Sequence, residues 1–173
     1  LLDTVLYLAT PTPWAHGFVP GRSVQTNAAP HCKQPWILNM DIKDFFPSIK
    51  FSRVLRVMRA LPTPWRITEE EAHLLTKVVM RKGRLPQGAP TSPHLANLVS
   101  RTLDWRLAAL SRQMGWMYTR YADDMTFSGS RKPKGLIPYV REIVHEEGFQ
   151  VSDKKTKMLP NYRRQLVTGL VVN

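Results

Sequence analysis

Two adjacent carboxylates, Asp123 and Asp124, stand between two short runs of strand-forming residues. Residues 116–121 before the pair are rich in Trp and Tyr, and residues 125–127 after it are Met, Thr and Phe. The flanks therefore predict a hairpin with the acidic pair at its tip. Like charges repel, but a divalent cation such as Mg2+ takes carboxylate oxygens and bridges phosphates. A solvated turn that happens to hold two Asp is the alternative that these residues alone leave open.

A third carboxylate, Asp41, stands near the end of an apolar run. Residues 36–42 are almost continuously apolar, which predicts a buried central strand. An unpaired carboxylate in such a strand would be costly. If the strand lies beside the hairpin, three carboxylates converge on one edge of a sheet. Such a cluster predicts a two-metal site for phosphoryl transfer, in which a 3′-hydroxyl attacks an α-phosphate and catalysis comes mainly from positioning and charge neutralisation.

The elements that must position these residues are helices interleaved with strands, without regular βαβ spacing. This order predicts an α+β fold rather than a doubly wound sheet. A helix is expected to begin at Ser92 and continue to near Gly115 as the longest of the chain. Other helices are expected over residues 1–9, 23–27 and 136–147, from Ser52, and from Thr68 with a capping box to Glu71; residues 165–172 are expected to form a last β segment.

Composition limits the class of protein and the kind of partner. The 173 residues are 43% hydrophobic, which is enough for a folded domain with a real core. Lys and Arg number 25 against 13 Asp and Glu, and the resulting charge of +12 favours nucleic acid as a partner. A merely solvated basic surface is the alternative. No apolar run approaches the roughly 18 residues of a membrane span, so no membrane partner is expected.

The single cysteine and one histidine exclude two kinds of site. Cys32 is the only cysteine, which rules out an internal disulfide and a cysteine-based zinc site. His31 has no Cys, His or carboxylate partner at ligand spacing. We therefore expect a hydrogen-bonded structural histidine or an RNA contact there, and not a metal ligand.

Four segments occur in the order and at the spacings of polymerase motifs A to D. They are residues 41–46 (DIKDFF), 85–93 (LPQGAPTSP), 121–124 (YADD) and 148–156 (GFQVSDKKT). Together they resemble the palm of a reverse transcriptase, and YADD in place of GDD points away from viral RNA replicases. Residues 27–31 (NAAPH) and 167–169 (VTG) further resemble elements of bacterial retron reverse transcriptases. Group II intron enzymes share much of this pattern and remain the alternative within the superfamily.

The resemblance implies roles for the acidic residues and one lysine. Asp41 and Asp123 would hold two Mg2+ ions, with Mn2+ as the alternative ion, and Asp124 would be the weaker or supporting ligand. Lys155 matches the motif D lysine that would protonate the leaving pyrophosphate. A solvated basic loop explains Lys155 almost equally well.

The resemblance also implies residues that bind the incoming nucleotide. Phe46 would lie under the sugar and exclude a 2′-hydroxyl, which selects dNTP over NTP. The alternative is that Phe46 packs in the core beside Phe45. That alternative is disfavoured if the two residues lie in a strand, because adjacent strand residues cannot both face inward. Gln87 and Gly88 would sit against the nucleotide, with a plain helix-start turn as the alternative. Arg22 could touch phosphate, although surface solvation explains that residue equally well.

For the whole chain, the resemblance implies a polymerase palm with an antiparallel sheet packed on helices. Part of the fingers is expected over residues 1–35 and the palm with the start of the primer grip over 36–173, with the thumb absent. The implied function is RNA-directed DNA polymerisation of retron type, although the isolated chain is expected to be weakly active or inactive. The implied partners are an RNA template and primer, RNA–DNA hybrid, dNTP, a cognate structured non-coding RNA and an effector protein. The implied setting is the bacterial cytoplasm and antiviral defense. A non-catalytic nucleic-acid-binding module with the same fold is the remaining alternative.

Overall fold

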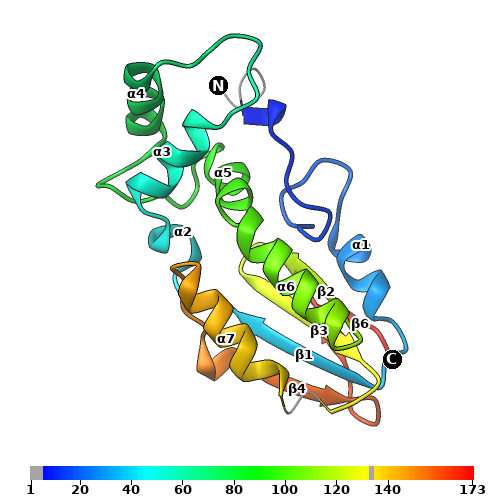
Figure 1. Ribbon diagram of the computed structural model, residues 1–173. Coiled ribbons are helices and arrows are strands. Elements are labelled where there is room, and N and C mark those ends of the chain that lie inside the picture. Colours follow the sequence, from blue (N-terminus) through cyan, green and yellow to red (C-terminus); the bar gives the residue numbers. More distant parts are fainter. Residues whose placement is uncertain (1–5, 133–134) are drawn as a thin grey trace. The chain divides into compact units, whose positions relative to one another are not determined.

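The computed structural model describes residues 6–132 and 135–173 (Figure 1). The chain divides into two compact units, each described by itself. The sheet unit contains residues 13–43 and 102–173, and the helical unit contains residues 1–12 and 44–101. The predicted division between fingers and palm at residue 35 stays a prediction. None of the described helices is long and apolar enough to cross a membrane.

The sheet unit is built on a four-stranded antiparallel sheet with the order β2-β3-β1-β4. Its strands are β1 (Trp36–Asp41), β2 (Trp116–Tyr121), β3 (Asp124–Gly129) and β4 (Lys157–Pro160). β1 pairs with both β3 and β4, so it is central, as its apolar run predicts. The hairpin predicted from the flanks 116–121 and 125–127 and the predicted α+β class are both confirmed.

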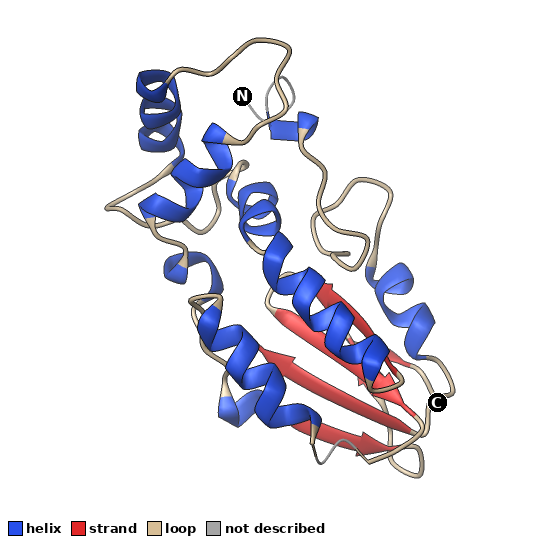
Figure 2. Ribbon diagram, in the orientation of Figure 1, coloured by secondary structure: helices blue, strands red, loops and turns tan. Residues whose placement is uncertain are grey.

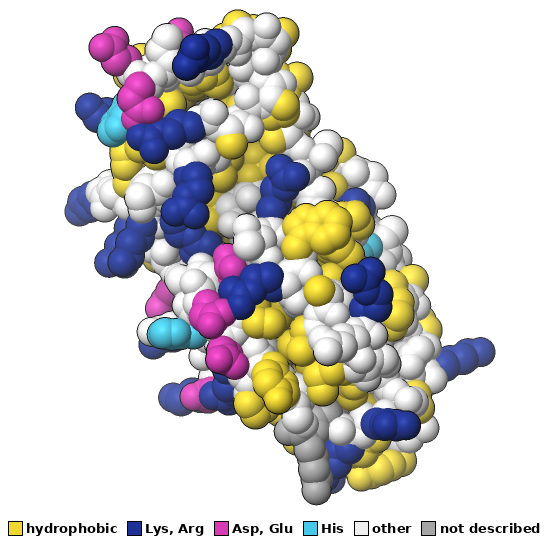
Figure 3. All heavy atoms as spheres, in the orientation of Figure 1, with side chains coloured by type: hydrophobic (Ala, Val, Ile, Leu, Met, Phe, Trp, Pro, Cys, Tyr) yellow, Lys and Arg dark blue, Asp and Glu magenta, His cyan; other side chains and the backbone are white. Residues whose placement is uncertain are grey.

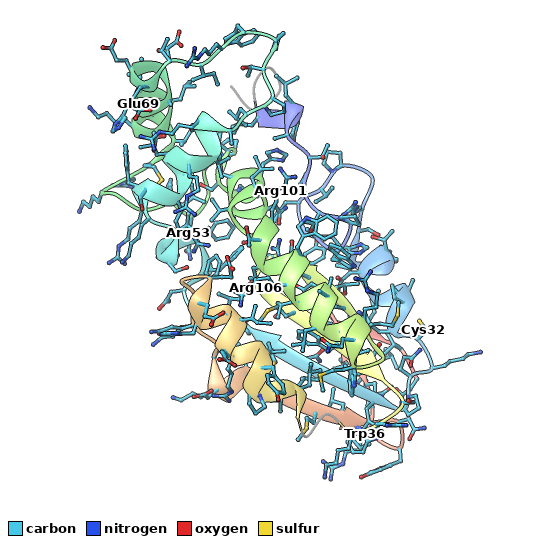
Figure 4. The ribbon with its side chains drawn as sticks, viewed as in Figure 1. Cys32, Trp36, Arg53, Glu69, Arg101 and Arg106 are labelled. Carbon is cyan, nitrogen blue, oxygen red and sulfur yellow. The ribbon has the colours of Figure 1, made fainter. Side chains whose placement is uncertain are left out.

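Two helices of this unit, α6 (Arg101–Gln113) and α7 (Leu136–Glu146), cover one face of the sheet (Figure 2). Each buries an apolar stripe at helical spacing, with Leu103 and Leu107 in α6 and Leu136, Val140 and Val144 in α7. The two helices are joined by Arg106 of α6, which donates hydrogen bonds to Glu146 and Glu147 at the end of α7 (Figure 4). This pairing fixes the C-terminal end of α7 against α6.

The other face of the sheet carries α1 (Val24–Ala28), the 3-10 helix η2 (Ala29–His31) and a small hairpin of β5 (Leu166–Val167) and β6 (Leu170–Val171). A small apolar cluster joins them to the sheet; its members are Ala28, Ile37, Val167, Val172, Leu159 and Leu170. Asn39 on the same face of β1 donates a hydrogen bond from Nδ2 to the carbonyl oxygen of Leu166 at 2.8 Å. The predicted last β segment is therefore a hairpin whose turn is Thr168 and Gly169.

The helical unit contains η1 (Leu6–Leu8), α2 (Phe45–Ser48), α3 (Phe51–Arg59), α4 (Glu69–Val79) and α5 (Ser92–Val99). The capping box between Thr68 and Glu71 is present as predicted, with both side chains bonded to the other's backbone N–H. The expected helix over residues 1–9 falls partly outside the described residues, and Leu6–Leu8 form a 3-10 turn instead.

The single helix expected from Ser92 to near Gly115 is wrong. α5 ends at Val99, Ser100 takes a ψ of 6°, and α6 begins at Arg101. The apolar stripe continues through both helices, so its periodicity cannot reveal a break that one residue makes.

Candidate active site

The three predicted acidic residues meet at one end of the sheet, called here the acidic end. The register of β1 and β3 sets Asp41 directly opposite Asp124. Tyr121 of β2 is also opposite Asp124, which leaves Ala122 and Asp123 as a two-residue turn. The backbone N–H of Ile42 donates to the carbonyl oxygen of Asp123 at 3.0 Å and ties this turn to β1. The predicted convergence of three carboxylates is therefore present in the geometry.

The acidic end concentrates negative charge where water is partly excluded. Burial raises the pKa of the Asp124 carboxyl to about 6, and the charges of Asp123 and Asp41 add to the rise. Burial likewise raises the pKa of Asp123, with a further contribution from Asp41. Asp41 is buried, whereas Asp124 keeps much of its solvent-accessible surface. Solvent therefore screens part of the repulsion at Asp124. A positive charge brought to this end would relieve the repulsion.

Lys155 supplies one such charge. It lies in the 3-10 helix η3 (Asp153–Lys155), and its Nζ donates a hydrogen bond to Oδ2 of Asp41 at 2.7 Å. This hydrogen bond raises the pKa of the Lys155 ammonium. The Lys155 side chain is 62% exposed while that of Asp41 is 6% exposed, so the lysine reaches in from solvent. The backbone N–H of Ser152 donates to the carbonyl oxygen of Asp41 at 2.8 Å and holds the segment in place.

The carboxylate oxygens of the acidic end are the kind of donor atom that binds a divalent cation. Within the described part of the chain, no three His, Cys, Asp or Glu side chains are arranged to hold a metal ion as they stand. The Lys155 ammonium occupies one oxygen of Asp41 in this arrangement. However, carboxylate oxygens are the donors that hard divalent ions prefer, and burial together with the neighbouring carboxylates raises the pKa of Asp123 and Asp124 although Lys155 lies nearby. The residues therefore fit such an ion once the lysine moves.

A buried ion pair that was not predicted from sequence anchors the Ala122–Asp123 turn. Arg120 is fully buried, and its Nε and Nη2 donate to the two carboxylate oxygens of Asp104 in α6 at 2.7 and 2.8 Å. Its Nη1 donates to the carbonyl oxygen of Ala122 in the turn at 2.9 Å. Tyr118 adds a hydrogen bond to Asp104 at 2.9 Å. The only sequence signal is that Arg120 shares a strand face with Tyr118 and Trp116.

A second unpredicted contact comes from the loop before α1. A Cβ atom on Gly17 would lie 2.6 Å from the backbone nitrogen of Ala122, which is closer than real Cβ contacts allow. The backbone N–H of His16 donates to the carbonyl oxygen of Arg120 at 2.7 Å. Arg22 holds the same loop by donating to the carbonyl oxygens of Pro13, at 3.1 Å, and Ala15. The phosphate contact of Arg22 stays a prediction, and the structure gives this guanidinium a bracing role.

The predicted nucleotide-binding residues Phe46, Gln87 and Gly88 belong to the helical unit, whereas the carboxylates and Lys155 belong to the sheet unit. Gln87 and Gly88 are exposed in a loop that is attached near α2 by a hydrogen bond from Leu85 N to Ile49 O at 3.2 Å. Their roles stay predictions.

The strand argument used for Phe46 is wrong. Phe45 and Phe46 lie in α2 and not in a strand, because Asp44 takes a left-handed φ of 48° and turns the chain. Phe45 is buried and Phe46 is half-buried, so Phe46 keeps a surface that could contact a sugar.

The two retron-like elements meet on the sheet face that carries α1. Asn27 Nδ2 lies 3.4 Å from Oγ1 of Thr168, a long hydrogen bond between the NAAPH and VTG segments. His31 is fully buried and bonds to Ser128 Oγ at 2.7 Å and Thr119 Oγ1 at 2.8 Å. Burial lowers the pKa of His31 to about 4, so the ring is neutral. His31 is therefore the structural histidine expected, and the alternative of an RNA contact does not fit a side chain with no exposure.

An antiparallel sheet covered on one face by α6 and α7, with carboxylates at a β-turn, is the arrangement of the palm of a nucleic-acid polymerase. Two telomerase structures share this fold: apo telomerase from Candida tropicalis, truncated from its C-terminal domain, and Candida albicans telomerase in complex with a TWJ fragment of telomeric RNA. Their TM-scores are 0.59 and 0.60 at 12% and 11% identity; each alignment covers 87% of this chain and 36% or 32% of the telomerase chain. These likenesses concern the fold alone.

The chain belongs to the reverse transcriptase (RNA-dependent DNA polymerase) family, whose model matches residues 3–167. It is 43% identical over 180 residues to the retron Mx65 reverse transcriptase of Myxococcus xanthus, covering 94% of this chain and 42% of that protein. It is 37% identical over 175 residues to the retron Ec86 reverse transcriptase of Escherichia coli, covering 100% and 53%. The predicted retron-type resemblance is confirmed, and the chain spans about half the length of these relatives or less. Reverse transcriptases generally use divalent metal ions.

Proposed function

We propose that the protein carrying this chain is a retron-type RNA-directed DNA polymerase that adds dNTPs to a primer on an RNA template. The observation that carries the proposal is the register that sets Asp41 opposite Asp124, with Asp123 in the turn beside them. The similarity to retron reverse transcriptases supports the same conclusion. We further propose an RNA template and primer, a cognate structured non-coding RNA and an effector protein as partners, and a bacterial cytoplasm as the setting.

The chemistry assigned to the acidic end is transfer of a nucleotide to a primer 3′-hydroxyl. Asp41 and Asp123 would hold two Mg2+ ions, with Asp124 in support. When bound, such ions neutralise the phosphates and activate the hydroxyl. The buried Arg120–Asp104 pair and Gly17 keep the Ala122–Asp123 turn from moving, which matters because in-line transfer tolerates little misplacement.

The resemblance assigns separate roles to Lys155 and Phe46. Once released from Asp41, the exposed ammonium of Lys155 would be free to donate a proton to the leaving pyrophosphate. Phe46 would exclude a 2′-hydroxyl by its bulk. Gln87 and Gly88 would then complete the nucleotide contacts from the same unit as Phe46.

The test is primer extension on an RNA template by the full-length protein with Mg2+. Asp123→Asn should lower the rate by about a thousandfold or more, because a ligand charge worth several kcal/mol is lost. Glu142→Gln on the exposed side of α7 is the matched control and should extend normally. In the same assay, Phe46→Val should raise incorporation of rNTPs relative to dNTPs. Extension by Asp123→Asn at the rate of the control would refute the proposed function.

A further inference from the structure

The end of the sheet away from the carboxylates gathers cations, and is called here the basic end. β1 begins at Trp36, which is paired with Gly129 at the end of β3 and with Pro160 at the end of β4. The segments that enter or leave these strands carry Lys33, Arg131, Lys132, Arg163 and Arg164. No Asp or Glu occurs in residues 29–36, 128–132 or 160–166. β1 separates the basic end from Asp41 by about 17 Å, at about 3.3 Å per residue.

The cations of the basic end are exposed and form none of the ion pairs found among the described residues. Elsewhere in the sheet unit, Arg106, Arg120, Arg141 and Lys155 each have a carboxylate partner. Figure 3 shows Lys and Arg side chains and no Asp or Glu at the lower right end of the drawn face. The basic end therefore presents a locally uncompensated positive charge.

The turn that carries Arg163 and Arg164 is held in one conformation by Asn173. Its Nδ2 donates to the carbonyl oxygens of Asn161 and Arg163 at 2.8 and 2.7 Å, and its Oδ1 accepts from the backbone N–H of Gln165 at 2.9 Å. The N–H of Asn161 donates to the carbonyl oxygen of Pro35 at 2.9 Å, which ties the turn to the start of β1. This bracing lowers the conformational entropy that a ligand would otherwise have to remove.

An aromatic ring stands among these cations. Tyr162 immediately precedes Arg163 and is 80% exposed, although a Tyr ring is usually packed or hydrogen-bonded. Trp36 lies beside the same turn, with the Lys132 ammonium 5.8 Å from its ring centroid (Figure 4). Arginines that contact phosphates next to an exposed ring that stacks on a base are the usual means of binding unpaired nucleic acid.

We propose that the basic end is a second RNA-binding surface, separate from the acidic end, that holds an RNA segment with unpaired bases. Arg163 and Arg164 contact its phosphates, and Tyr162 stacks on one of its bases. An acidic protein partner would satisfy the charges but would leave Tyr162 without a role. The surface does not depend on nucleotide transfer, so it can be tested whether or not the proposed function holds.

The experiment measures the affinity of the full-length protein for a fluorescein-labelled single-stranded RNA by anisotropy, over a series of salt concentrations. The double variant Arg163→Glu with Arg164→Glu should bind about tenfold more weakly or worse, and its slope of log affinity against log salt should be shallower by about 2. The matched control is Arg56→Glu with Lys77→Glu, which makes the same change of charge at exposed positions of α3 and α4. It should bind much closer to the unmodified protein.

The aromatic part of the proposal has its own variants. Tyr162→Ala should weaken RNA binding by about fivefold or more, and Tyr162→Phe should restore it, because stacking needs the ring and not the hydroxyl. Thermal unfolding of each variant checks that the fold is kept. Equal losses in the two charge-reversal pairs, or no loss at Arg163 and Arg164, would overturn the proposal. So would equal binding of a DNA of the same sequence, or displacement of the RNA by polyglutamate at equal charge.

Discussion

The two ends of the four-stranded sheet place like charges in opposite ways. At the acidic end, the register of β1 and β3 brings Asp41 and Asp124 face to face, partly shielded from water. At the basic end, five exposed cations are spread over three separate segments that enter or leave the strands. Repulsion is therefore stronger at the first end than at the second. The acidic end has to be held together by the protein around it, whereas the basic end only has to be held in shape.

The supports of the two ends differ accordingly. The acidic turn is fixed from beneath by the buried Arg120–Asp104 pair and from the side by the close approach of Gly17. The basic turn is fixed by exposed hydrogen bonds from the amide of Asn173. A site for concentrated charge needs a rigid, dry scaffold, and a surface for an extended polyanion needs reach and accessibility.

The largest expected effect on this comparison comes from removing the buried Arg120–Asp104 pair. Asp104→Ala leaves the Arg120 guanidinium buried without its partner, and we expect it to cost about 3–5 kcal/mol of unfolding free energy. Glu146→Ala, which removes an exposed partner of Arg106, is the control and should cost less than about 1 kcal/mol. Chemical denaturation measures both. Similar costs for the two variants would mean that Arg120 and Asp104 are not the main support of the acidic turn.

Between the two ends, His31 joins β2 to β3 and makes the middle of the sheet sensitive to acid. Its pKa is lowered to about 4 by burial, from an ordinary value of 6.5. The unfolded chain therefore binds the extra proton first, and stability falls as pH drops from about 6.5 to about 4. The expected loss over that window is roughly 3 kcal/mol. Denaturation at several pH values should show this loss, reduced in His31→Asn and retained in His73→Asn, which alters an exposed ring.

The side support of the acidic end can be tested by a single methyl group. Gly17→Ala would press a Cβ against the backbone of the Ala122 turn, and we expect it to destabilise the protein by about 1–3 kcal/mol or to displace the turn. Gly135→Ala is the control, since its Cβ would meet only the Met114 side chain at 3.9 Å. The midpoint of thermal unfolding and the rate of primer extension should both fall for Gly17→Ala and should not change for Gly135→Ala. An unchanged midpoint and rate for that variant would show that the loop yields.

The smallest effect concerns the repulsion itself. In the absence of divalent ions, Asp124→Asn removes one of three crowded charges and should stabilise the protein by up to about 1 kcal/mol, since solvent screens this exposed position. Added Mg2+ should stabilise the unmodified protein more than the variant. Arg164→Gln is the counterpart at the basic end, where separated charges predict no comparable gain. Destabilisation by Asp124→Asn without ions would contradict crowding at the acidic end.

The strands and the convergence of the carboxylates could be predicted because both follow from the pattern of apolar residues within short segments. The apolar run before Asp41 and the aromatic strands around Asp123 determine which segments are buried. Burial of both in one sheet brings their acidic ends together. The capping box at Thr68 was equally visible, since its two partners are only three residues apart.

The remaining features depend on contacts between distant residues. Asp104 and Arg120 form a pair only because α6 lies on the face of β2 that carries Arg120. The sequence around each residue does not indicate which residue it pairs with. Gly17 is one glycine among nine, and only the proximity of Ala122 makes it special. The helix break at Ser100 and the turn at Asp44 each depend on one backbone dihedral angle, which an apolar pattern does not encode.

The pairing of β1 with β3 has a consequence for how the protein is made. Asp41 and Asp124 are neighbours in the sheet but lie far apart along the chain. A polypeptide emerging from the ribosome therefore exposes Asp41 long before its partner strand exists, and the acidic end cannot assemble until β3 has been synthesised. Long-range strand pairing of this kind also slows folding.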